Sequence, residues 1–142
     1  MRALLDVNVL IARLDADHTS HETALAWFRD NAKNGWASCP ITQNGCVRVM
    51  SHPAYPNAHT VNEISRRLHR ASIERIHEFW PDDVSVLNDQ VIDTTRIHGP
   101  RQLTDVYLLA LAVGRGGALV TFDRSIALNA VRGATAASVV VL

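Results

Sequence analysis

Three aspartates stand at positions where a carboxylate could do chemistry. Asp6 ends the apolar run that begins at Arg2. Asp123 follows the apolar run 118–122, and Asp105 opens a segment with helical spacing. If three carboxylates converge within about 5 Å, each pair repels by roughly 3 kcal/mol at an effective dielectric constant near 20. A hard divalent cation would remove this repulsion, and oxygen ligands without His or Cys favour Mg²⁺ or Mn²⁺.

Each aspartate also has a purely structural explanation. Asp105 in the first turn of a helix is stabilised by the helix dipole, and Asp123 can cap the turn that begins at Arg124. Asp6 fits such an explanation less well, because a charged side chain at the end of a buried strand is seldom left without a partner. The joint pattern favours a shared metal site made by all three residues.

The order of apolar runs predicts the elements that must position these residues. Strands that alternate with helices predict an α/β fold around a mostly parallel sheet, in one domain spanning residues 1–142. In such a sheet, ligands bind beyond the carboxyl ends of the strands, where Asp6 and Asp123 are expected. Strands are expected at 2–6, 36–39, 84–87, 118–122 and 138–142, and helices at 7–14, 20–34, 41–50, 60–71 with an extension over 74–80, 91–98 and 104–115.

Composition excludes several other classes of function. Fourteen Lys and Arg side chains balance fourteen Asp and Glu, so any contact with nucleic acid must come from local charge. Lys33, the only lysine, stands in no GxxxxGK[ST] phosphate-binding loop. Cys39 and Cys46 form no zinc pattern and are expected to be reduced thiols in the cytoplasm. No apolar run reaches the ~20 residues of a membrane span, so no membrane contact is expected.

Four blocks of sequence point to a known family. They are Leu4–Ile11, Cys39–Met50, Leu103–Ala112 and Thr121–Asp123. In their order and spacing, these blocks resemble the successive motifs of PIN-domain ribonucleases, specifically the VapC-type toxins. The resemblance spans nearly the whole chain. It implies a PIN-like three-layer fold, in which a central, mostly parallel sheet is flanked by helices.

The resemblance also implies an activity. In the family, Asp6, Asp105 and Asp123 would bind Mg²⁺ or Mn²⁺ and act in catalysis, and Asn8 would orient the first aspartate. A metal-activated water would attack an RNA phosphodiester in line and leave 3′-hydroxyl and 5′-phosphate ends. The resemblance further implies a cognate antitoxin protein as partner, and a homodimer.

Gln43 departs from the family pattern, which commonly has a glutamate after Pro-Leu/Ile-Thr. Its amide oxygen can accept a hydrogen bond from a metal-bound water, but the side chain cannot take up a proton or add negative charge. Gln43 is either a natural variant of this pocket or a substitution introduced to silence a toxic protein. The alternative function is therefore a PIN-fold module that binds RNA or protein with little or no cleavage.

Arginines supply two further candidate contacts with RNA. Arg48, five residues after Gln43, is a candidate phosphate contact in the substrate site. A group of four arginines in the middle of the chain could follow an RNA backbone, but it alternates with glutamates and also fits a solvated helix face. The group comprises Arg66, Arg67, Arg70 and Arg75, and the glutamates are Glu63, Glu74 and Glu78.

Overall fold

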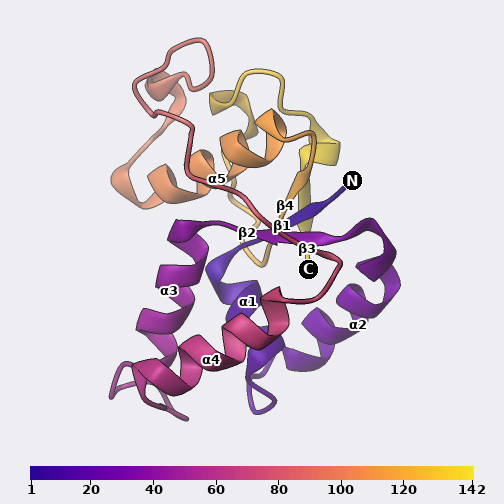
Figure 1. The fold of residues 1–142 in the computed structure, drawn as a ribbon. Coiled ribbons are helices and arrows are strands. Elements are labelled where there is room, and N and C mark those ends of the chain that lie inside the picture. The colour runs from indigo at the N-terminus through magenta and orange to yellow at the C-terminus, as the bar shows by residue number, and fades with distance from the viewer.

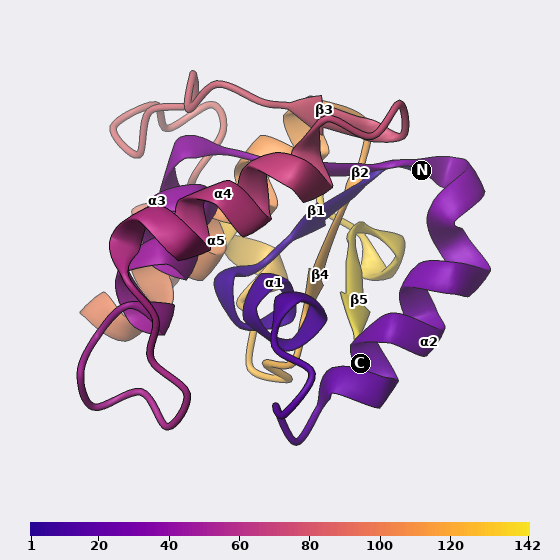
Figure 2. The ribbon, with the colours of Figure 1, turned by 60° about the horizontal axis from the view of Figure 1, so that its bottom comes forward.

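A single five-stranded sheet runs through the computed structural model, which describes residues 1–142. The strands lie in the order β3-β2-β1-β4-β5, and every neighbouring pair is parallel (Figure 2). Because the strands are parallel, all their carboxyl ends meet at one edge of the sheet. The strands are β1 (Ala3–Leu5), β2 (Trp36–Ser38), β3 (His77–Phe79), β4 (Ala118–Thr121) and β5 (Val139–Val141).

Five α-helices cover the two faces of this sheet, as Figure 1 shows. Four of them lie on one face and α5 lies on the other, so the expected three-layer α/β fold is confirmed. None of these helices combines the length and apolar character needed to cross a membrane. The helices are α1 (Val7–Leu14), α2 (His21–Asn31), α3 (Pro40–Met50), α4 (Val61–Ser72) and α5 (Leu103–Gly114).

Two hydrophobic clusters, one on each face, hold the layers together. Leu4 and Leu119 point toward α5, whereas their neighbours Leu5 and Val120 point toward the layer of α1, α3 and α4. This alternation follows from the period of two along a strand. Since both faces are covered, β1 and β4 are apolar and buried throughout, as is usual for a parallel sheet.

Local sequence signals set where several of the helices begin and end. Pro40 both ends β2 and occupies the first position of α3, where its missing N–H costs nothing. Thr60 and Glu63 form a reciprocal capping box at the start of α4. At the end of α5, Gly116 has a φ of 65°, a left-handed conformation that suits glycine and turns the chain into β4. The glycine-rich run after α5 is thus a helix stop, as the sequence predicts.

The predicted helical extension over 74–80 is wrong, because this segment contains the edge strand β3. The helix α4 ends at Ser72, and the Ile76 carbonyl then accepts a hydrogen bond from the Trp36 N–H at 2.9 Å. Arg2 Nη1 donates to the same carbonyl at 2.8 Å. Pairing with β2 therefore decides the conformation of a segment whose own sequence lacks the apolar run of a buried strand.

The predicted strand at 84–87 and the predicted helix at 91–98 are also wrong. Residues 84–87 have no strand beside them, because β3 already occupies that edge of the sheet. Val84 packs against the α5 cluster, whereas Leu87 is 90% exposed. The later segment is fixed by a single bridge between Ile92 and Val131, followed by a short 3₁₀ turn. Both apolar runs are thus used for packing rather than for regular structure.

Candidate active site

Asp6 is the buried centre of the acidic group. It directly follows β1 and caps α1, where its Oδ1 accepts a hydrogen bond from the Val7 N–H at 2.6 Å. Its Oδ2 accepts a second bond from the Thr121 hydroxyl at 3.0 Å. A carboxylate is favoured at a helix N-terminus by the unpaired N–H groups and the dipole. These contacts hold the carboxylate rigidly between β1, β4 and α1.

Asp123 follows β4 and is held by its own turn. Its N–H donates to Thr121 Oγ1 at 3.0 Å. Its Oδ1 accepts hydrogen bonds from the Ser125 N–H at 2.7 Å and from the Ser125 hydroxyl at 2.6 Å. These bonds from Ser125 are the main reason why the pKa of Asp123 lies below its ordinary value.

Asp105 reaches the same place from the first turn of α5. Burial, the negative charges of Asp6 and Asp123, and a hydrogen bond to Asp123 raise the pKa of Asp105 to about 6. The same interaction contributes to the lowered pKa of Asp123. The pKa of Asp6 is also raised, first by burial and in part by the charge of Asp123, against the opposing effect of its two hydrogen bonds.

The three predicted metal ligands therefore come together at the carboxyl edge of the sheet. The pKa of each aspartate is shifted by at least one of the other two, although 18 to 117 residues separate them in the sequence. The three side chains therefore lie close together in the fold. Three carboxylates without a neighbouring His or Cys are the donor set that hard divalent cations prefer. The oxygen ligands that these residues offer therefore fit Mg²⁺ or Mn²⁺.

The arrangement of these carboxylates is nevertheless not that of a formed metal site. No group of three or more His, Cys, Asp or Glu side chains in the structure is placed so that it could hold a metal ion. The carboxyl groups of Asp105 and Asp123 instead interact with each other, which raises the pKa of Asp105 and lowers that of Asp123. Metal binding would require Asp105 to be ionised and the carboxylates to turn toward one ion. The metal-binding and catalytic roles of Asp6, Asp105 and Asp123 stay predictions.

The contacts of Gln43 are with residues outside the acidic pocket. Its amide Nε2 donates to the Ser38 hydroxyl at 2.9 Å, and that hydroxyl oxygen lies 2.9 Å from His77 Nε2. Gln43 also lines the hollow between α3 and α4, on the face of the sheet opposite α5. The hydrogen bonds and charges that act on the three aspartates do not include Gln43. Its catalytic role thus stays a prediction without support from these contacts.

The two predicted substrate contacts, Asn8 and Arg48, are both exposed. Asn8 lies in the first turn of α1, two residues after Asp6. Arg48 lies in the last turn of α3 and lines a separate hollow with residues of the 52–56 loop. The structure thus places Asn8 close to the pocket in sequence and fold, and it directs Arg48 toward a different part of the surface.

Comparisons with known proteins agree with this geometry. The family model for the PIN domain matches residues 3–132. This chain belongs to the PIN-domain family. It is 58% identical over 135 residues to ribonuclease VapC44 of Mycobacterium tuberculosis, and the match covers 95% of each chain. It is also 41% identical over 134 residues to ribonuclease VapC39 of the same organism, and this match covers 94% of this chain and 96% of that protein.

A solved structure shows the same fold at low sequence identity. The PIN domain matches a chain of VapBC2 from Rickettsia felis bound to a DNA fragment from their promoter, with a TM-score of 0.57 and 16% identity. The match covers 88% of this chain and 90% of that chain. The resemblance of the four sequence blocks to VapC-type PIN ribonucleases is thus confirmed.

Sequence reasoning missed three residues that shape the pocket of this PIN domain. Thr121 and Ser125 hold Asp6 and Asp123, and both stand two positions from Asp123, where a hydroxyl could have been noticed. Gly45 is the third. A Cβ at this position would lie 2.7 Å from Val7 Cγ2, so Gly45, rather than Gln43, is the part of α3 that packs against the start of α1.

Helix geometry explains the difference between Gln43 and Gly45. Residues that are two positions apart on an α-helix are rotated by about 200° around its axis, so Gln43 and Gly45 point to nearly opposite sides of α3. Gly45 faces α1 and the end of β1, whereas Gln43 faces α4. A glycine within a helical segment was the available signal, because such a residue often marks a close approach.

Proposed function

We propose that this PIN domain is an endoribonuclease toxin of the VapC type, which hydrolyses RNA phosphodiester bonds with the help of Mg²⁺ or Mn²⁺. The observation that carries the proposal is the pocket in which Asp6, Asp105 and Asp123 interact at the carboxyl edge of the sheet. The similarity to ribonucleases VapC44 and VapC39 over nearly the whole chain supports the reaction class.

The residues of the pocket have separable chemical tasks. A bound divalent cation would lower the pKa of a water molecule and stabilise negative charge on the phosphate. Asp6 would be a fixed ligand, because Val7 and Thr121 already orient both of its oxygens. Asp123 keeps its negative charge through its bonds from Ser125. Asp105 is the group that can gain or lose a proton close to neutral pH, since its pKa is raised to about 6.

We also propose that the domain works with an antitoxin protein and as a homodimer in the cytoplasm. Membership of the VapC-type group supports this assembly. An antitoxin that covers the acidic pocket would prevent RNA from reaching it. Copurification of the chain with the product of a neighbouring small gene, followed by measurement of the mass of the complex, would test this part of the proposal.

A second candidate function is a PIN-fold module that binds RNA or protein without efficient cleavage. Two observations favour it: Gln43 is engaged by Ser38, and the pKa of Asp105 is raised to about 6 where an ionised metal ligand is expected. In this case the pocket would lack both the additional acid and a formed cation site. The two candidates differ in whether added divalent cation produces cleavage.

RNA cleavage with and without Mg²⁺ or Mn²⁺ tests both candidates. The purified chain is compared with Asp6→Asn, Gln43→Glu and the control Asp30→Asn, which changes an exposed carboxylate on α2. We expect Asp6→Asn to lower the cleavage rate by about 100-fold or more, a typical loss for a group that acts on the transferred proton or charge. Asp30→Asn should cleave like the parent chain.

The outcomes separate the two candidates. Cleavage by the parent that requires the cation and leaves 3′-hydroxyl ends supports the nuclease. Cleavage that appears only in Gln43→Glu supports the binding module. Equal cleavage by Asp6→Asn and the parent would show that the acidic pocket is not the active site.

A further inference from the structure

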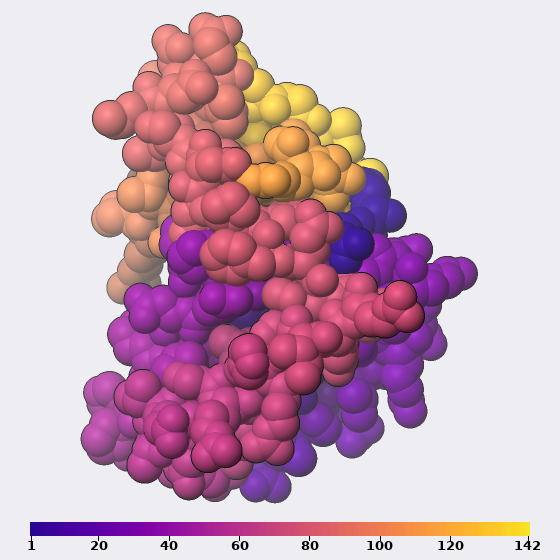
Figure 3. Space-filling model, viewed as in Figure 1, coloured from indigo at the N-terminus to yellow at the C-terminus, as the bar shows by residue number.

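The outward face of α4 carries a hollow that the acidic pocket does not use. It has a volume of about 250 Å³ and no apolar side chain in its lining, which consists of His59, Glu63, Arg66, Arg67 and Arg70. We refer to these five residues as the arginine hollow. Figure 2 shows α4 on the outside of the helical layer, and the space-filling view in Figure 3 shows its residues at the surface.

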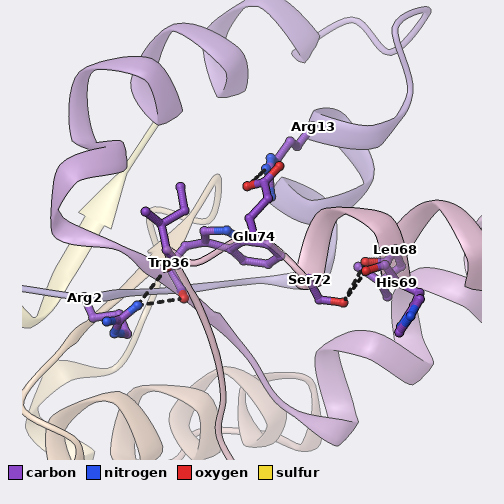
Figure 4. A network of polar contacts seen from close by, with 8 residues as sticks. Arg2, Arg13, Trp36, Leu68, His69, Ser72 and Glu74 are labelled. Atoms are coloured by element: carbon purple, nitrogen blue, oxygen red, sulfur yellow. Dashed lines mark hydrogen bonds and ion pairs between the residues drawn. The ribbon is translucent and has the colours of Figure 1, made fainter.

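The glutamates that alternate with these arginines in the sequence are engaged elsewhere. Glu74 Oε2 lies 3.3 Å from Arg13 Nη2, a contact that Figure 4 shows beside Trp36. Glu78 Oε2 lies 2.9 Å from Arg2 Nε. Both acids therefore neutralise Arg2 and Arg13 rather than the arginines of α4. The interpretation of α4 as a charge-balanced solvated face depended on this neutralisation, and it loses that support.

Glu63 is the only acid within the hollow, and it is occupied by the helix cap. Its Oε2 accepts hydrogen bonds from the Thr60 N–H at 2.8 Å and from the Thr60 hydroxyl at 3.1 Å, and His59 Nδ1 lies 3.6 Å away. The contacts with Thr60 are the main cause of the lowered pKa of Glu63. Neither Arg66 nor Arg70 forms an ion pair with a carboxylate.

Arg66 and Arg70 are four residues apart on α4, so their positive charges repel each other. Residues four apart are neighbours on a helix, and like charges at this spacing destabilise it by a few tenths of a kcal/mol, about 0.2–0.5. An anion between the two guanidinium groups would turn this repulsion into attraction. Phosphate suits such a site, because the planar guanidinium group can donate two parallel hydrogen bonds to it. A lining without apolar side chains offers little to a hydrophobic ligand.

We propose that the arginine hollow binds phosphate groups of RNA and so helps to hold the substrate backbone on the helical side of the domain. The choice of RNA among polyanions rests on the proposed ribonuclease function. The chain has no net charge, so a local site of this kind must supply much of the attraction for a polyanion.

The test measures binding of a labelled single-stranded RNA to the full chain by fluorescence anisotropy, in EDTA so that cleavage does not interfere. The affinity is followed over a series of salt concentrations for the parent and for the double variant Arg66→Ala/Arg70→Ala. We expect affinity at low salt to fall about 10-fold. The slope of log K against log salt should become shallower by about 1.4, since each phosphate contact with a single strand contributes about 0.7.

A matched control separates this site from general charge. Arg29 and Lys33 are also four residues apart, exposed and free of ion pairs, at the end of α2 and the turn that follows it. The variant Arg29→Ala/Lys33→Ala removes the same charge and should leave the salt slope within error of the parent. Circular dichroism should show unchanged helix content in both double variants, since alanine favours helix.

Three outcomes would overturn the proposal. The first is an unchanged affinity and salt slope in Arg66→Ala/Arg70→Ala. The second is an equal change in the control variant. The third is an equal loss of affinity for poly-glutamate, which would assign the hollow to an acidic protein partner. Cleavage by the parent is measured separately with Mg²⁺. If the parent cleaves RNA but the double variant binds RNA normally, only the proposed role of the arginine hollow is refuted. If the double variant binds RNA more weakly but the parent does not cleave, only the nuclease proposal is refuted.

Discussion

The three aspartates of the acidic pocket differ in how firmly each is held. Asp6 has hydrogen bonds to both oxygens, and Asp123 has two bonds from Ser125. Asp105 has no comparable pair of hydrogen bonds, and burial together with the negative charges of Asp6 and Asp123 raises its pKa. A pKa raised to about 6 means that the pocket changes its charge in the range where an RNA-cleaving protein would work.

The pocket therefore predicts a pH dependence of stability. The folded-state pKa of Asp105 is raised to about 6 from 3.8, so the folded state binds more protons than the unfolded state between these values. Asp105 thus destabilises the fold above about pH 6, and this cost disappears as the pH falls toward 4. Replacing Asp105 by Asn should raise the free energy of unfolding at pH 7.5 by about 1–2 kcal/mol, after allowance for solvent screening.

Urea unfolding at pH 7.5 and pH 4.5 checks this expectation. Asp105→Asn should be more stable than the parent at the higher pH and should keep only about a third of that advantage at pH 4.5. Asp123→Asn serves as the opposite case, because a pKa below the ordinary value stabilises the fold at neutral pH and its loss should destabilise. A stabilising effect of Asp105→Asn that is the same at both pH values would refute the raised pKa of Asp105.

At the scale of the elements, close packing between α1 and α3 supports the helix that follows Asp6. Both helices begin at the carboxyl edge of the sheet, one after Asp6 and the other after Cys39. They approach closely because Gly45 has no side chain to separate them from Val7. The cost is a glycine inside a helix, which lowers helix stability by up to about 1 kcal/mol relative to alanine.

This packing predicts that Gly45→Ala destabilises the protein although alanine favours helix. A Cβ at 2.7 Å from Val7 Cγ2 requires a shift of packed side chains, and such overpacking typically costs about 1–3 kcal/mol. We expect a net loss of about 1 kcal/mol in urea unfolding. Gly114→Ala is the control, since a Cβ there meets nothing within 4 Å and should leave stability equal or slightly higher.

A double variant tests the cause directly. In Val7→Ala/Gly45→Ala the shorter side chain makes room for the new methyl group, so the two effects should not add. Additive losses would show that Gly45 is needed for some reason other than its contact with Val7.

At the scale of the whole molecule, the acidic pocket joins the two layers of the fold. Asp6 belongs to the strand–helix junction of β1 and α1, Asp123 follows β4, and Asp105 comes from α5 on the opposite face. A ligand that binds all three residues would bind the folded state only. Such a ligand must raise the stability of the whole domain.

Added Mg²⁺ or Mn²⁺ is therefore expected to raise the melting temperature of the chain. At a cation concentration ten times its dissociation constant, the gain is about 1.4 kcal/mol, from RT ln(1 + c/Kd) with c the free cation concentration. Differential scanning calorimetry over a concentration series would measure it. Asp105→Asn should show a smaller gain, and Asp30→Asn should show the full gain. An equal gain in all three proteins would point to binding outside the pocket.

Much of the architecture could be predicted from local patterns. The apolar runs around Leu4, Ala37, Leu119 and Val140 correspond to four of the five strands. The strands β1, β2 and β4 are buried throughout and therefore largely apolar, whereas the edge strand β5 is apolar although it is only partly buried. The predicted helices at 7–14, 41–50 and 104–115 lie within one residue of the observed bounds. The edge strand β3 could not be found in this way, since it has no apolar run and forms by pairing with β2.

The sequence by itself determined the layered α/β fold, the family, and the placement of three aspartates at the ends of buried elements. Only the tertiary structure decided that Asp105 lies close enough to Asp6 and Asp123 for its pKa to rise, that Gln43 faces α4, and that Glu74 and Glu78 leave Arg66 and Arg70 without an ion pair. The physical reason is one of range. Hydrophobic periodicity is a property of neighbouring residues, whereas charge pairing and side-chain direction depend on which distant elements meet.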